Sequence, residues 1–207
     1  MEDTRICHVV AAVPTARLPK KRGGDLTIAA DAGYIQLINN GITPDAVVGD
    51  FDSAPRPDLR SVSVFPKRKD DTDTLLALRE GLSRGYRHFR IYGGIGGLLD
   101  HTLANIQALA FLAKNGAHGV LVGERECVML LTVGESVTLP SPKRDARLSV
   151  LAYGESAAVS LYGLAYTGED IPLSDAFPLG VGNLFTEEEA RISVKKGRVL
   201  LITEALL

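Results

Sequence analysis

Short apolar runs alternate with longer amphipathic segments from residue 5 to about residue 130. The short runs are rich in β-branched residues and predict strands at 5–13, 26–31, 45–50, 62–65, 88–94 and 118–123. The longer segments carry apolar residues at helical spacing, each ends in a glycine, and they predict helices at 32–41, 71–85 and 98–116. A repeated order of strand, helix and strand predicts a parallel sheet with helices on its faces.

The pattern changes after about residue 130, where short apolar runs are broken by Gly, Pro and Asp. This texture is typical of a small antiparallel β domain, and the only helix candidate within it is the stretch "TEEEA" at 186–190. We therefore expect an α/β domain at 1–132, with a mostly parallel, Rossmann-like sheet flanked by helices. A small β domain at 133–207 follows it, and the boundary is expected near 132–136.

Aspartates follow the predicted parallel strands at the points where those strands end. In "AVVGDFDSAP" two of them stand one residue apart, so their carboxylates repel each other unless a cation lies between them. Ligands of open parallel sheets collect at the carboxyl ends of the strands, which favours a metal and phosphate site there. An ordinary solvated turn is the alternative for each stretch taken alone. The aspartates in question are Asp31, Asp50, Asp52, Asp70, Asp71, Asp73 and Asp100.

These donors are all oxygens, with no cluster of Cys or His beside them, and such a set suits Mg²⁺ bound together with substrate phosphates. The glycine-rich "GGIGG" at 93–97 permits close approach of backbone N–H groups to a phosphate, although a flexible turn explains it equally well. Lys67, Arg68 or Lys69 precede the acidic stretch and are within reach of phosphate oxygens. The chain therefore suggests a nucleotide polyphosphate as ligand, without a Walker A loop or a GxGxxG motif.

Purely structural roles remain open for several of these residues. Asp71 or Thr72 is a good helix N-cap, and capping alone explains one acid at that position. His101 and Asn105 share one face of the third predicted helix, where each is either a participant in the chemistry or a structural hydrogen-bonding group.

Composition narrows the choice of partners. A net charge of −2 gives no electrostatic argument for nucleic acid or an anionic membrane as partner. Cys7 and Cys127 lie in apolar runs and are expected to be buried thiols. No apolar stretch is long enough for a membrane helix and the first residues do not look like a leader peptide, so a cytoplasmic protein is expected.

Four motifs, "AADAGY", "GDFDS", "KDDTDT" and "GGIGGLLDHTLANI", occur in this order and together resemble the thiamine pyrophosphokinase family. The resemblance continues more loosely into "YGLAYTGEDIPL" and "GVGNLF" and so covers nearly the whole chain. It implies an N-terminal domain for ATP and Mg²⁺, a C-terminal β-sandwich, and a homodimer with thiamine at the subunit interface. The implied reaction transfers the pyrophosphoryl group of ATP to the thiamine hydroxyl and releases AMP.

The resemblance also implies roles for individual residues. The implied catalytic residues are Asp50, Asp71, Asp73 and Asp100, and the metal ligands are the same four together with Asp52. ATP would be bound by Asp31, Asp52, Lys69, Gly96, Gly97, His101 and Asn105. Thiamine would be bound by Asp73, Tyr166, Gly182 and Asn183, with Tyr166 stacking on its pyrimidine ring.

The chain departs from the family pattern at three places. Leu98 stands where the family has the arginine of GGRxDH, and Gly182 stands where it has the serine of a Ser-Asn pair. The first strand runs into "AAVPTA" instead of a glycine turn. These departures keep a second possibility open, a nucleotide- and thiamine-binding regulatory module without full turnover, which a turnover assay would separate from an enzyme.

A third possibility is a metal-dependent phosphoesterase of the DHH type, suggested by "GDFD" and "LDH". That class requires paired histidines, whereas the four in this chain are scattered along it, at His8, His88, His101 and His118.

Overall fold

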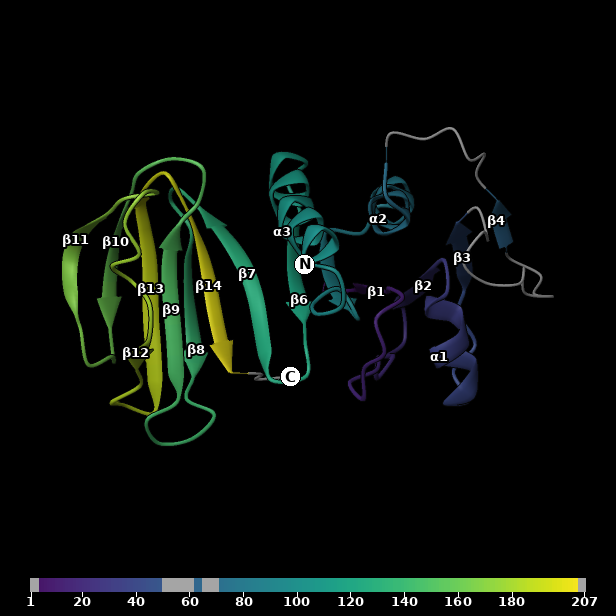
Figure 1. The fold of residues 1–207 in the computed structure, drawn as a ribbon, viewed down its shortest axis with the longest axis horizontal. Coiled ribbons are helices and arrows are strands. Elements are labelled where there is room, and N and C mark those ends of the chain that lie inside the picture. Colours follow the sequence, from purple (N-terminus) through teal and green to yellow (C-terminus); the bar gives the residue numbers. More distant parts are fainter. Residues whose placement is uncertain (1–3, 50–61, 65–70, 205–207) are drawn as a thin grey trace. The chain divides into compact units, whose positions relative to one another are not determined.

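The computed structural model describes residues 4–49, 62–64 and 71–204 of the chain, with only the backbone for 62–64. It divides into two compact units, residues 1–124 and 125–207 (Figure 1). The division falls before the strand Glu126–Thr132, whereas the sequence suggested a boundary near 132. The difference is one strand, and that strand pairs along its whole length with the antiparallel strand Arg198–Glu204 of the second unit.

The first unit contains a six-stranded sheet in the order β6-β5-β1-β2-β3-β4, and the described strands of this sheet pair in parallel. A parallel order requires crossovers, and helices supply three of them, as the alternating pattern predicted. The strands are β1 (Ile6–Val10), β2 (Leu26–Ala30), β3 (Ala46–Gly49), β4 (Val62–Val64), β5 (His88–Tyr92) and β6 (His118–Val122).

Each helix of this unit follows a strand of the sheet along the chain (Figure 1). They are α1 (Gly33–Asn39), α2 (Asp73–Ser83) and α3 (Leu99–Lys114). α1 packs on β1 and β2, α2 on β1, β2 and β3, and α3 on β6. All three were predicted to within three residues at each end. No helix in the described ranges is both long enough and apolar enough to cross a membrane.

The second unit is built from two antiparallel groups of strands, β12-β9-β14-β7 and β11-β10-β13-β8. Inward-facing residues of both groups share one apolar core, so the unit is a sandwich. The predicted short helix at 186–190 is absent, because Glu189 and Ala190 begin β13 instead. The strands are β7 (Glu126–Thr132), β8 (Ser136–Pro140), β9 (Arg147–Ala152), β10 (Ala157–Tyr162), β11 (Gly168–Leu173), β12 (Asn183–Leu184), β13 (Glu189–Lys196) and β14 (Arg198–Glu204).

Both cysteines are buried thiols, Cys7 in β1 and Cys127 in β7, as expected. Burial raises the pKa of the Cys7 thiol well above its usual range, so this thiol stays protonated and unreactive.

Candidate active site at the carboxyl edge of the parallel sheet

Asp31 occupies the turn between β2 and α1 at the carboxyl edge. Its backbone takes a left-handed φ of 45°, which Asp tolerates better than most residues, and its N–H donates to Val48 O at 2.8 Å. The last residue of β3, Gly49, packs against it so closely that an added Cβ would lie 3.1 Å from Asp31 Cα. Asp31 is buried, and its Oδ1 has no hydrogen-bond partner in the described part of the chain. A buried carboxylate oxygen without a partner is costly, so the position suits a cation.

The start of α2 separates capping from the other acids. Thr72 is the N-cap, and its Oγ1 accepts a hydrogen bond from Leu75 N at 3.2 Å. Asp71 does not cap the helix, because its carboxylate pairs with Arg79 Nε at 2.7 Å. Asp73 lies in the first helical turn, where a negative charge is favoured by the helix dipole. Of the two capping candidates, Thr72 takes the role, and Asp71 forms an ion pair instead.

The glycine-rich loop 93–97 connects β5 to α3. Gly96 and Gly97 both have left-handed φ values, 95° and 63°, and an added Cβ at Gly97 would lie 3.2 Å from a Val13 methyl. Only glycine therefore fits both the conformation and the space. Asn105 is buried and its Nδ2 donates to Gly94 O at 2.9 Å, so in this structure it ties the loop to α3. These glycines and the Asn105 hydrogen bond therefore give the loop a defined conformation.

The first turn of α3 carries the last acid of the set. Asp100 is exposed, and its Oδ1 accepts a hydrogen bond from His101 N at 2.8 Å. The His101 side chain is also exposed. Leu98, which replaces the family arginine, is the N-cap residue of α3 and is 67% exposed. No cationic side chain stands at that position.

Three of the predicted site residues, Asp50, Asp52 and Lys69, lie outside the described residues, as do Lys67, Arg68 and Asp70. Within the ranges that the structure describes, no three His, Cys, Asp or Glu side chains come together as a metal site. The assembled ligand set therefore remains a prediction. The described members, Asp31, Asp71, Asp73 and Asp100, all follow the carboxyl ends of parallel strands or begin the helices after them.

The segment 11–17, where the family has a glycine turn, is anchored at several points. Gln36 of α1 donates from Nε2 to Ala11 O at 2.7 Å and to Val13 O at 3.3 Å, and its Oε1 accepts from Thr15 N at 3.2 Å. Further along, Ala16 N donates to Glu124 Oε1 at 2.5 Å. Sequence reasoning did not single out Gln36, because a polar residue on a short surface helix carries no distinguishing signal.

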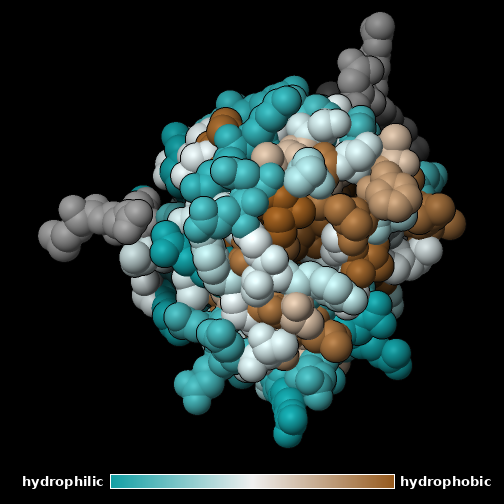
Figure 2. All heavy atoms as spheres, turned by 90° about the vertical axis from the view of Figure 1, so that its left-hand side faces the viewer, coloured by the Kyte–Doolittle hydropathy of each residue, from teal (hydrophilic) through white to brown (hydrophobic). Residues whose placement is uncertain are grey.

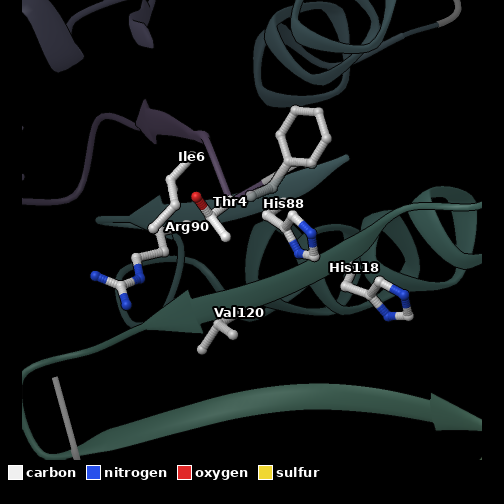
Figure 3. Close-up of a pocket in the computed structure, with 7 residues that line it drawn as sticks. Thr4, Ile6, His88, Arg90, His118 and Val120 are labelled. Carbon is white, nitrogen blue, oxygen red and sulfur yellow. The ribbon is translucent and has the colours of Figure 1, made fainter. Parts of the chain in front are cut away.

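A hollow of about 410 Å³ lies at the opposite, amino-terminal edge of the same sheet (Figure 3). The His88 and His118 rings that line it are stacked with their centroids 5.9 Å apart. It is also lined by Thr4, Ile6, Phe89, Arg90 and Val120, so no carboxylate of the described residues reaches it. It is separate from the acidic edge.

In the second unit, the residues predicted to bind thiamine lie together. Asn183 is buried, and its amide makes three hydrogen bonds: Oδ1 accepts from Tyr166 N at 2.9 Å and Leu184 N at 3.0 Å, and Nδ2 donates to Tyr166 O at 2.8 Å. The Tyr166 side chain is 77% exposed, so it does not fill the core of this unit. Gly182 has a φ of 77°, and its N–H donates to Ser149 Oγ at 3.0 Å. Asn183 thus holds Tyr166 at the surface.

Comparisons with known proteins agree with this arrangement. The family model "Thiamin pyrophosphokinase, catalytic domain" matches residues 21–121, within the first unit. The thiamine pyrophosphokinase of Bacillus subtilis is 26% identical over 94% of this chain and 96% of its own length. The crystal structure of thiamine pyrophosphokinase from Bacillus subtilis superposes with a TM-score of 0.87 at 25% identity, covering 98% of this chain and 100% of that one. The Candida albicans enzyme, at 14% identity and a TM-score of 0.78, covering 97% of this chain and 90% of that one, shares the fold.

The fold and these matches define the class of protein. It is a kinase built from an α/β unit followed by a β unit. The chain is similar to thiamine pyrophosphokinases along nearly its whole length.

Proposed function

We infer that this chain is a thiamine pyrophosphokinase, which transfers the pyrophosphoryl group of ATP to the hydroxyl of thiamine to give thiamine diphosphate and AMP. The inference rests on similarity to thiamine pyrophosphokinases along nearly the whole chain. This similarity covers both the matched catalytic region and the β unit. The acids and the glycine-rich loop at the carboxyl edge are the groups that such a transfer needs.

The glycine-rich loop is the proposed site of the ATP phosphates. Gly96 and Gly97 leave backbone N–H groups accessible to phosphate oxygens, and the positive end of α3 follows directly. Lys69 and His101 are proposed to add charge or hydrogen bonds to the same phosphates. Asn105 supports ATP binding through the loop, because its amide is committed to Gly94 O.

The described residues fit Mg²⁺ as cofactor on two grounds. The donors are carboxylate oxygens, and the unpartnered Oδ1 of Asp31 is a buried negative group. Asp50, Asp52, Asp71, Asp73 and Asp100 are the proposed ligands, with Asp31 beside them. When bound, the ion neutralises charge that develops on the phosphate oxygens during transfer.

In the proposed reaction the thiamine hydroxyl oxygen forms a bond to the β-phosphorus while the bond from that phosphorus to the oxygen of AMP breaks. A carboxylate of the site accepts the hydroxyl proton, and AMP leaves with the bridging oxygen. Tyr166 is proposed to stack on the pyrimidine ring, and Asp73 and Gly182 are proposed to lie beside the thiamine. Asn183 fixes the Tyr166 backbone.

A homodimer with thiamine at the subunit interface is also proposed. Apolar side chains gather on one face of the β unit (Figure 2), and exposed residues of this unit include Phe177, Leu179 and Val181. Exposed apolar groups of this size favour an interface. Light scattering on the purified protein would report twice the chain mass, and a monomeric mass at working concentration would contradict the proposal.

Incubation of the protein with ATP, Mg²⁺ and thiamine, followed by mass spectrometry of the products, tests the function. Thiamine diphosphate together with AMP is the expected result. Formation of ADP and thiamine monophosphate, or binding of both substrates without any product, would overturn it.

A further inference from the structure

The loop that is proposed to hold the ATP phosphates rests on a second loop, residues 11–17. Val13 N donates to Gly93 O at 3.3 Å, and Ala11 N donates to Tyr92 O at 2.8 Å. The Val13 side chain lies directly beside Gly97, where an added Cβ would meet it at 3.2 Å. Any displacement of Val13 therefore changes the space available to the glycine-rich loop.

The position of Val13 is set largely by one side chain. The Gln36 amide bonds to Ala11 O, Val13 O and Thr15 N, and so spans the segment on both sides of Pro14. Pro14 has no N–H of its own to contribute, which leaves this stretch short of backbone hydrogen bonds. A carboxamide supplies both donors and an acceptor, and no other uncharged side chain of that length does so.

We propose that Gln36 is a positioning residue for ATP: its amide fixes residues 11–15, and these residues fix the glycine-rich loop 93–97. Gln36 itself touches no substrate. This role rests on the proposed function, which identifies the nucleotide as ATP. It also gives residues 11–15, which stand where the family has a glycine turn, a part in nucleotide binding.

The test compares Gln36→Met with Asn39→Leu. Each change replaces a carboxamide of α1 by an apolar chain of similar size, and Asn39 is exposed at the end of the helix. We expect Gln36→Met to raise the KM for ATP about five- to tenfold, with a much smaller change in the KM for thiamine and in Tm. Asn39→Leu should leave all three unchanged.

A double variant identifies the route of the effect. Val13→Ala removes the methyl contact beside Gly97, so it should raise the KM for ATP on its own. If Gln36 acts through Val13, the double variant Gln36→Met with Val13→Ala should raise the KM by less than the product of the two single effects. Fully multiplicative effects would overturn the proposed route.

Calorimetric binding of a non-hydrolysable ATP analogue separates this proposal from the proposed function. A five- to tenfold weaker Kd in Gln36→Met supports the positioning role even in a protein that does not turn over thiamine. Unchanged analogue binding, or equal weakening toward both substrates together with a lower Tm, would show that Gln36 is only structural.

Discussion

The glycine-rich loop of the α/β unit and the Tyr166 segment of the β unit are each held by a buried asparagine, but in different ways. Asn105 donates a hydrogen bond to Gly94 O, and left-handed glycines together with the neighbouring segment 11–17 add further support. Asn183 uses its whole amide on Tyr166 and Leu184. The first loop is held mainly by its backbone conformation and by packing, whereas at Tyr166 the asparagine amide holds the chain together with a backbone hydrogen bond from Ala165 N to Leu184 O at 2.9 Å.

This difference teaches how a family motif is to be interpreted. Both asparagines were predicted as ligand-binding residues from their place in the motifs, and in this structure both amides bind backbone groups of the chain itself. A buried amide with satisfied hydrogen bonds is a poor direct ligand, because a new partner must replace an existing one. We therefore expect both asparagines to act on binding indirectly, through the backbone that they hold.

The largest expected effect tests whether the chemistry belongs to the α/β edge. Asp71→Asn and Asp73→Asn should each lower kcat about 100-fold or more with Tm nearly unchanged, since their carboxylates are proposed to serve the metal and triphosphate. Glu80→Gln is the control, because Glu80 lies in α2 and pairs with Arg84, as Asp71, just before α2, pairs with Arg79. Steady-state kinetics decide it. Near-normal kcat in both Asp variants would contradict this role and would show that Asp71 only forms a surface ion pair.

The next prediction compares what the two asparagines contribute to stability. Asn183→Ala leaves the N–H and C=O of Tyr166 without their partner, so it should lower the free energy of unfolding by about 2–3 kcal/mol. Asn105→Ala removes one hydrogen bond and should cost about 1 kcal/mol. Urea denaturation measures both. Equal losses at the two sites would remove the contrast between them.

Stacking on the pyrimidine ring predicts a smaller, selective effect at Tyr166. Tyr166→Ala should raise the KM for thiamine about tenfold, or ~1.4 kcal/mol, with little change for ATP. Tyr166→Phe should keep most of the affinity, because the ring face is retained. Tyr162→Ala is the control: Tyr162 is 43% exposed on the same unit, and its hydroxyl donates to Glu169 Oε1. A similar KM change at both tyrosines would argue against stacking.

The smallest expected effect concerns pH. Burial lowers the pKa of His8, although its contact with Asp25 Oδ2 at 3.3 Å opposes the shift. The unfolded chain then binds the proton more readily than the folded one, so stability is present above pH 6.5 and declines as the pH falls below it.

The same measurement separates His8 from its neighbour. Burial would raise the pKa of Asp25, but hydrogen bonds from Ile6 N, Arg22 N and His8 lower it overall, so its contribution is lost only in more acidic solution. Unfolding at pH 7.5 and 5.5 should show a smaller difference in His8→Asn than in the wild type. An unchanged difference would assign the pH dependence to other groups.

The sequence predicted the α/β unit well because periodicity and glycine stops mark its elements directly. It placed the boundary one strand late, because the apolar run of β7 looks like any strand of the first unit until its partner β14 is known. Residue types and strand ends also suggested an acidic site at the sheet edge, and that site stays a prediction. The roles of Gln36, Asn105 and Asn183 depend on which backbone groups lie within hydrogen-bond distance, and that information exists only in three dimensions.

Gly182 has a consequence for anyone who redesigns this chain. Its φ of 77° and the Arg147 Nη2 atom, 2.9 Å from where a Cβ would be, mean that a serine at this position must strain the backbone and displace the arginine. The end of the Arg147 side chain can move aside, but the left-handed φ remains. A designer who wants a serine at this position must therefore change the conformation of the turn as well as the residue.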